Sequence, residues 1–155
     1  MRANPTEIPG VVAPPPLLYA IPLAVGLLAQ HFWPVPILWP DIGRVAGMVL
    51  IGLGFVGFAG IVAFRRARTS PNPWKPSTTL VVSGIYRRTR NPMYLGFTLL
   101  YLGITAWVNT LWPLLPLPVV LVLMQRGVIA REEAYLEARF GDEYRRYRAA
   151  VRRWI

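Results

Sequence analysis

Two short clusters of polar residues carry the chemistry that this sequence can support. In the first, Arg90 and Asn91 stand directly before Pro92. Asparagine is a common N-cap and proline a common first helical residue, so this triplet predicts a helix start. The free backbone N–H groups of such a start attract a carboxylate or a phosphate, and Arg90 adds positive charge beside them. The second cluster is the adjacent pair Glu132 and Glu133.

Each cluster also has a simpler structural interpretation. Asn91 and Pro92 can merely begin a helix, with Tyr94 as an aromatic anchor at a membrane surface. The two glutamates can be solvated charges that pair with nearby arginines, worth well under about 1 kcal/mol each. Both interpretations stay open from these residues alone.

Other familiar motifs are excluded by their context. The chain has no cysteine, which removes thiol catalysis and thiolate metal sites, and its only histidine, His31, cannot make a metal site alone. Gly52, Gly54 and Gly57 spell a dinucleotide-binding motif, but they lie in an apolar run and no acidic residue occurs between Asp41 and Glu132. We interpret this motif as small-residue helix packing, shared with Gly43, Gly47 and Gly60.

Long apolar runs place these clusters in a membrane protein. Of the 155 residues, 54% are hydrophobic, more than one small soluble core would hide. After a Pro-rich lead-in, residues 1–16, which we expect to be disordered, come four apolar runs, and the last two are joined by a tight turn at Asn109 and Thr110. The runs are Leu17 to Phe32, Val45 to Phe64, Met93 to Trp107 and Leu111 to Met124. We therefore predict an all-α integral membrane protein with four transmembrane helices.

The distribution of charge supports four spans. The net charge is +10, and fifteen of the 17 basic residues lie either in the loop 65–91 or after residue 125. An even number of spans puts both segments on one side, which the positive-inside rule makes the cytoplasmic side, together with both termini. The basic segments adjoin apolar runs and contain no nucleic-acid-reading module, so we expect membrane lipids and no nucleic acid as partners.

The chain ends in an amphipathic tail that we expect to pack at the cytoplasmic side. Apolar and aromatic residues recur there at intervals of three or four among many arginines. Gly141 predicts a break between two helices, with Asp142 capping the second. We divide the single domain into the lead-in, two transmembrane helices (17–64), the basic loop (65–91), and the hairpin with the tail (92–155), which would form the binding site.

In combination, these segments resemble the superfamily of isoprenylcysteine carboxyl methyltransferases and phospholipid methyltransferases. Three stretches carry the resemblance over about residues 71–154: PNPWKPSTTLVVSGIYRRTRNPMYLG, an apolar hairpin, and EEAYLEARFGDEYRRYRAAVRRW. The resemblance implies an enzyme that uses S-adenosylmethionine, bound on the cytoplasmic side between the start of the third span and the tail. It also implies a lipophilic methyl acceptor, and a bacterial-type member would lie in the inner membrane of a prokaryote.

The resemblance also implies roles for particular residues. Arg90 and the amides near Asn91 and Pro92 would hold the cofactor carboxylate, and Glu132 or Glu133 its ammonium or ribose. Tyrosines would line its base and sulfonium, and Glu133 and Arg90 are the candidate catalytic residues. The full set of expected cofactor-binding residues is Tyr86, Arg90, Asn91, Pro92, Tyr94, Gly96, Glu132, Glu133, Tyr144 and Tyr147.

Three matters stay open from the sequence. Many members of the superfamily have histidine where this chain has Asn91, which weakens any mechanism with an imidazole base there. The acceptor can be a prenylcysteine carboxylate, a phospholipid amine or a hydrophobic thiol, and we expect its tail to enter beside Gly96 and Gly103, where small residues leave room. The alternatives are an NADPH-dependent reductase of the sterol reductase type and a non-catalytic membrane scaffold.

Overall fold

The computed structural model describes residues 8–155, and every regular element in that range is a helix. The expected lead-in lies partly outside it, at residues 1–7. The elements in chain order are α1 (Pro15–Phe32), α2 (Pro40–Gly54), α3 (Val56–Arg66), η1 (Gly84–Arg87), α4 (Pro92–Val108), η2 (Trp112–Leu114), α5 (Leu117–Val122), η3 (Leu123–Ile129), α6 (Ala130–Phe140) and α7 (Asp142–Ala150).

Glycines let α4 pack closely against α2 and α3, as the small-residue pattern predicts. A Cβ atom added to Gly47 would lie 2.6 Å from the backbone nitrogen of Trp107, and one on Gly96 would lie 2.7 Å from the Cα atom of Gly57. Such distances leave no space for a side chain, so backbone meets backbone at this interface. Gly52 is different, because nothing lies within 4 Å of an added Cβ there.

The room that we expected for a lipid tail beside Gly96 and Gly103 is therefore absent. α2 and α3 fill it, since a Cβ on Gly103 would lie 2.7 Å from the backbone nitrogen of Ile51. That expectation is wrong, because the missing side chains admit a neighbouring helix rather than a ligand.

The last apolar run does not end where the tail begins. α5 continues through the π-helix η3 into α6 without a break, so the second arm of the hairpin and the first half of the tail form one helical stretch. Gly141 ends α6 with a positive φ of 54°, which confirms the predicted break. Asp142 does not cap α7, however: it is the first residue of that helix, and its carboxylate binds Arg145 at 2.6 Å.

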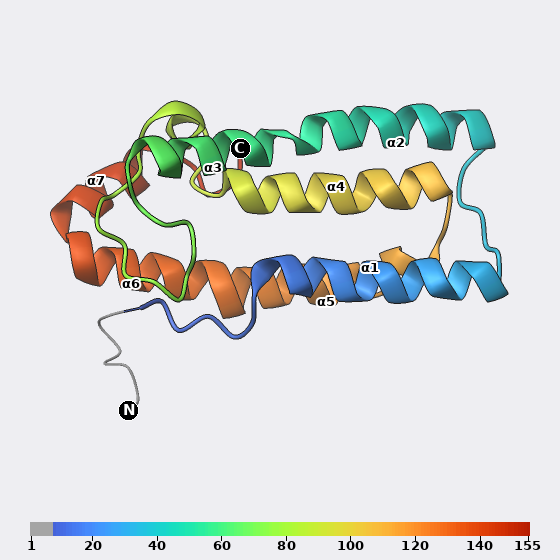
Figure 1. The fold of residues 1–155 in the computed structure, drawn as a ribbon, viewed down its shortest axis with the longest axis horizontal. Coiled ribbons are helices and arrows are strands. Elements are labelled where there is room, and N and C mark those ends of the chain that lie inside the picture. Colours follow the sequence, from blue (N-terminus) through green and yellow to red (C-terminus); the bar gives the residue numbers. More distant parts are fainter. Residues whose placement is uncertain (1–7) are drawn as a thin grey trace.

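The connections of the bundle separate its two ends (Figure 1). The loop between α3 and α4, the helices α6 and α7 and the C-terminus lie together at one end, and the connection between α1 and α2 and the turn after α4 lie at the other. At the far end, the Asn109 side chain accepts hydrogen bonds from the backbone N–H groups of Ile37 and Leu38. Most of the basic residues therefore gather at the end that holds α6 and α7, as the charge distribution predicts.

Three helical stretches are long and apolar enough to cross a membrane, namely Pro15–Phe32, Pro40–Arg66 and Trp112–Phe140. α4 is apolar but has only 17 residues, a length of about 25 Å. Large apolar side chains such as Val25, Val49 and Val119 point outward from these helices. A surface of that kind suits contact with lipid.

The segment before α1 is not a free lead-in over its described part. The backbone N–H of Val12 donates to the carbonyl of Gly127, and the guanidinium of Arg131 donates to the carbonyl of Gly10 at 2.7 Å. Val11 is buried in the main core cluster. Residues 8–14 thus lie against η3 and α6, because Val11 offers an apolar contact and the carbonyl of Gly10 a partner for an arginine.

Candidate functional site

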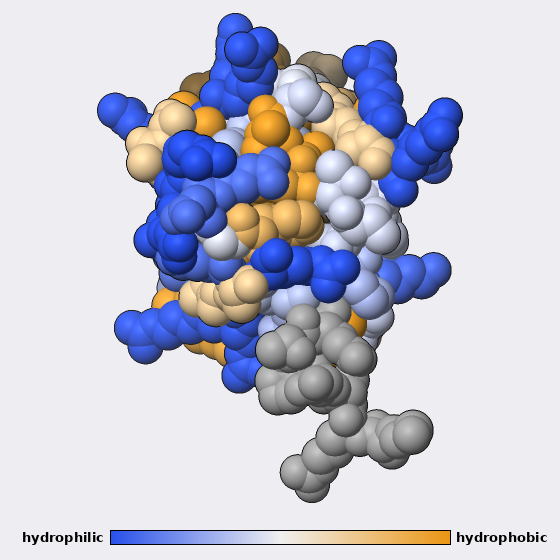
Figure 2. Space-filling model, turned by 90° about the vertical axis from the view of Figure 1, so that its left-hand side faces the viewer, coloured by the Kyte–Doolittle hydropathy of each residue, from blue (hydrophilic) through white to orange (hydrophobic). Residues whose placement is uncertain are grey.

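A hollow opens at the end of the bundle that carries α6 and α7. The space between its atoms, including the open solvent at its mouth, is about 810 Å³, which is within the range of small-molecule sites. Figure 2 views this end and shows apolar surface at its centre with hydrophilic side chains around it. Eight of the ten expected cofactor-binding residues line the hollow: Tyr86, Arg90, Asn91, Tyr94, Glu132, Glu133, Tyr144 and Tyr147. We call it the donor pocket, after the methyl donor that the resemblance predicts there.

Pro92 and Gly96 are not among the lining residues. Pro92 is fully buried at the start of α4. Gly96 faces the backbone of Gly54 and Gly57 in the neighbouring helices. Both residues belong to helix packing, so the structure does not bring them into the pocket with the others.

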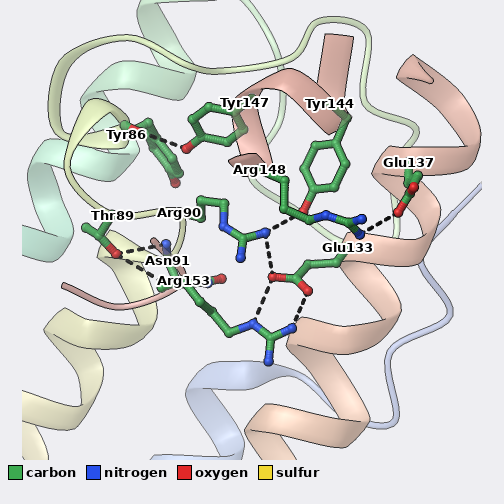
Figure 3. Close-up of polar contacts among 10 residues, drawn as sticks. All are labelled: Tyr86, Thr89, Arg90, Asn91, Glu133, Glu137, Tyr144, Tyr147, Arg148 and Arg153. Carbon is green, nitrogen blue, oxygen red and sulfur yellow. Dashed lines mark hydrogen bonds and ion pairs between the residues drawn. The ribbon is translucent and has the colours of Figure 1, made fainter. Parts of the chain in front are cut away.

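Glu133 lies between two arginines. Its Oε1 atom is 3.0 Å from Nη1 of Arg90, and it also accepts a hydrogen bond of 2.9 Å from Nε of Arg153. A second bond from Arg153 reaches Oε2, so that guanidinium binds the carboxylate with two nitrogens (Figure 3). Only 12% of the Glu133 side chain and 11% of the Arg90 side chain are exposed. Both carboxylate oxygens of Glu133 are therefore occupied by guanidinium groups.

Arg90 is held on several sides, but one of its buried nitrogen atoms has no hydrogen-bond partner among residues 8–155. Its Nη1 donates to the hydroxyl of Tyr144 at 3.3 Å, and its backbone N–H donates to the carbonyl of Arg152. Nε of Arg90 is buried and has no hydrogen-bond partner among residues 8–155. Buried donors are nearly always satisfied, so an orphaned one in a pocket wall indicates a missing acceptor.

Glu132 has a different environment from its neighbour. Its Oε1 atom accepts a hydrogen bond of 2.6 Å from the hydroxyl of Tyr94, and within residues 8–155 it forms no ion pair. The pocket therefore contains one carboxylate neutralised by two guanidinium groups and another that has a tyrosine as its partner.

The start of α4 is built differently from the expected cap. Asn91 stands at the N-cap position, but its side chain makes no capping hydrogen bond. Its Nδ2 donates instead to the carbonyl of Arg153 at 2.9 Å, and the hydroxyl of Thr89 donates to the same carbonyl. The residues after α7 are thus tied by backbone contacts across the start of α4. We call residues 151–155 the C-terminal strap.

Three tyrosines of the pocket stay neutral at ordinary pH. Burial raises the pKa of Tyr86, Tyr144 and Tyr147 above the usual tyrosine value, and the nearby charge of Glu133 raises that of Tyr144 further. The hydroxyl of Tyr147 donates to the carbonyl of Tyr86 at 2.7 Å. These side chains therefore offer aromatic faces and hydrogen bonds rather than a phenolate base.

Sequence reasoning missed Arg153, Thr89 and Tyr135. Arg153 and Thr89 act through the strap, which only the tertiary fold brings beside α4. The hydroxyl of Tyr135, three residues after Glu132, accepts a hydrogen bond of 2.9 Å from the backbone N–H of Ser77 and so fixes the loop at the mouth of the pocket. The three-residue spacing from Glu132 was a usable signal for Tyr135, whereas nothing in the sequence singles out Arg153 among the arginines of the tail.

Comparison with known proteins gives consistent results. A family model described as phospholipid methyltransferase matches residues 42–143. Over 63 residues, 41% of this chain, the sequence is 44% identical to the whole length of an uncharacterized protein of Haemophilus influenzae. Over 108 residues, 70% of this chain, it is 39% identical to the protein-S-isoprenylcysteine O-methyltransferase of Schizosaccharomyces pombe, and that alignment covers 41% of the yeast protein. No solved structure matches the chain.

Proposed function

The chain belongs to the phospholipid methyltransferase family, and on that basis we propose that it transfers the methyl group of S-adenosylmethionine to a lipophilic acceptor at a membrane surface. One observation carries the choice of donor. The donor pocket combines an arginine with an unsatisfied buried N–H, a glutamate with no ion pair among residues 8–155, and several tyrosine rings. These are the groups that a zwitterionic amino acid joined to a nucleoside requires.

The residues present fit the two charges at the amino acid end of the cofactor. Arg90 and Arg153 against Glu133 leave one net positive charge, so Arg90 can receive a carboxylate at its free Nε. Glu132 supplies the negative charge for the ammonium. The faces of Tyr86, Tyr144 and Tyr147 would adjoin the sulfonium and the base, since aromatic faces attract cations.

The geometry supports different roles for the two glutamates. Glu133 is a positioning residue, because its oxygens are occupied by Arg90 and Arg153 and its function is to aim Arg90 into the pocket. Glu132 touches the cofactor, and Tyr94 fixes its orientation. The sequence leaves the cofactor ammonium to either glutamate and makes Glu133 a candidate catalytic residue, whereas these contacts support Glu132 as the residue in direct contact and Glu133 as a positioning residue.

S-adenosylmethionine supplies a methyl group that is already activated on a sulfonium. The protein residues then bind, align and shield the reactants, and alignment alone can supply about 7 to 11 kcal/mol of the barrier. No base is needed for a carboxylate or thiolate acceptor. An amine acceptor must lose a proton, and Glu132 is the best placed group because both oxygens of Glu133 bind guanidinium groups and Tyr86, Tyr144 and Tyr147 have raised pKa values. Because Glu132 is already assigned to the cofactor ammonium, this arrangement supports a prenylcysteine carboxylate or a thiolate as acceptor over a phospholipid amine.

The proposal includes a topology. We propose four spans, with α4 as the short third one, both termini in the cytoplasm and the inner membrane of a prokaryote as the location. The gathering of basic segments at one end of the bundle supports it, since an odd number of spans would separate them. In this orientation the donor pocket opens to the cytoplasm, where a water-soluble cofactor can reach it.

A binding titration separates this function from its two rivals. The purified protein in detergent micelles would be titrated with S-adenosylmethionine and, separately, with NADPH. We expect S-adenosylmethionine to bind at least about tenfold more tightly than NADPH. Glu132→Gln should weaken S-adenosylmethionine binding about tenfold, whereas Glu143→Gln, whose side chain is exposed outside the pocket, should leave it unchanged. Preference for NADPH would favour the reductase, and no affinity for either cofactor would favour the scaffold.

A further inference from the structure

A second hollow lies on the side of the bundle, between α4 and the helix formed by α5 and η3. Its volume, again with open solvent included, is about 870 Å³. Leu95, Leu121 and Val122 give it apolar walls, and Trp154 of the C-terminal strap also lines it. It shares no lining residue with the donor pocket, although Tyr94 of that pocket is the neighbour of Leu95. We call it the side groove.

One cation stands in this groove at an unusual depth. Arg126 precedes Glu133 by seven residues, so it lies about 10 Å further into the bundle along the helix. Thr98, on the opposite wall, is six residues beyond Pro92 and lies about 9 Å from the start of α4. Both distances place the Cα atom of Arg126 among the apolar residues of the bundle.

Arg126 has no partner of opposite charge within the chain as described. No ion pair of Arg126 occurs among residues 8–155, and what distinguishes it from the other unpaired arginines is its place beside the apolar walls of the groove. Its side chain is exposed, and Gln125 and Thr98 are the polar neighbours in the groove. An arginine at such a depth is costly unless it reaches the interface or meets an anion, which marks it as a candidate functional residue.

We infer that the side groove binds the lipid acceptor and that Arg126 holds an acidic group of that lipid, a phosphate or a carboxylate. A guanidinium binds either group with two parallel hydrogen bonds, and Gln125 offers a further donor. The chains of the lipid would lie along Leu95, Leu121 and Val122. Tyr94 of the donor pocket and Leu95 of the side groove are neighbours in α4, so the two hollows open on adjacent sides of that helix, and a lipid in the groove lies next to the donor pocket. The inference rests on the proposed methyl transfer, and it makes Arg126 a specificity-determining residue.

Lipid retention tests the site independently of catalysis. The full chain would be incorporated into phosphatidylcholine vesicles containing about a fifth phosphatidylglycerol, released into detergent, and examined by native mass spectrometry for bound phosphatidylglycerol. We expect the wild-type protein to retain one phosphatidylglycerol molecule. The lipid-bound fraction should fall at least about tenfold in Arg126→Gln and only partly in Arg126→Lys. Arg139→Gln, which removes the same charge from an exposed position outside both hollows, is the control and should retain the lipid.

A second measurement distinguishes an acceptor from a structural lipid. In methyl transfer to a total lipid extract, Arg126→Gln should raise the KM for lipid about tenfold and leave the affinity for S-adenosylmethionine unchanged. Unchanged lipid retention in Arg126→Gln, or equal loss in Arg139→Gln, would overturn the site. Lost retention with an unchanged KM would mean a structural lipid and would also overturn the inference. Failure of the wild-type protein to bind S-adenosylmethionine would instead refute the proposed function.

Discussion

Replacing Glu133 by glutamine should strongly destabilise the protein. Glu133 and Arg90 are each exposed by little more than a tenth, and both guanidinium groups of the cluster bind the one carboxylate. Removing one partner of a buried ion pair leaves an uncompensated buried charge and typically costs about 3 to 5 kcal/mol. Glutamine keeps the volume and one acceptor, so we expect a loss near the lower end, about 3 kcal/mol.

The two arginines should contribute unequally. The Arg153 side chain is 34% exposed, against 11% for Arg90, so water screens its interaction with Glu133. Arg153→Gln should therefore cost only about 1 kcal/mol, since Glu133 would still bind Arg90. A double-mutant cycle should accordingly give a larger coupling energy between Glu133 and Arg90 than between Glu133 and Arg153.

The assay is reversible unfolding in mixed micelles, titrated with dodecyl sulfate and followed by circular dichroism. Glu143→Gln, an exposed residue of α7 with no ion pair among residues 8–155, is the matched control and should change the unfolding free energy by less than about 0.5 kcal/mol. If Glu133→Gln loses no more than this control, the buried cluster does not stabilise the fold, and our account of how Arg90 is aimed fails with it.

Three further predictions concern single residues. Tyr94→Phe removes the hydrogen bond to Glu132 and should weaken S-adenosylmethionine binding about tenfold by calorimetry. Tyr101→Phe, which removes a hydrogen bond from the middle of α4 to the carbonyl of Pro113, should not weaken it, and equal effects would contradict the role of Tyr94. Gly96→Ala should destabilise the protein by about 1 to 3 kcal/mol in the micelle assay because its Cβ meets the next helix, while Gly52→Ala, with open space, should be neutral or stabilising. Ser83→Cys, in a chain without native cysteine, should react with a membrane-impermeant maleimide only after the cells are permeabilised, and reaction in intact cells would reverse the proposed topology.

Much of the fold is predictable from the sequence because the membrane imposes it. The apolar runs must be helical for their backbone groups to be satisfied in lipid, and the Asn-Pro pair at residue 91 marks the start of α4. The glycines of α2 and α3 indicate close packing for the same local reason. Composition and local pattern are sufficient at these positions because no distant contact is needed.

The different roles of Glu132 and Glu133 were not predictable. A helical wheel assumes α-helical geometry throughout, but the π-helix η3 precedes these residues and changes the phase in which they leave the membrane. The sequence therefore does not reveal that Glu132 points to Tyr94 and Glu133 to Arg90. Arg153 was missed for a related reason, because the strap reaches the start of α4 only through tertiary contacts.

Methyl transfer itself tests the central claim most directly. The purified protein in lipid vesicles would be incubated with S-adenosylmethionine labelled in its methyl group and a total lipid extract, with Glu132→Gln and Glu143→Gln in parallel. We predict that label appears in a lipid or a hydrophobic thiol with the wild-type and Glu143→Gln proteins and is lost with Glu132→Gln. Absence of label from every lipid and thiol, in a preparation that binds S-adenosylmethionine, would contradict the proposed function.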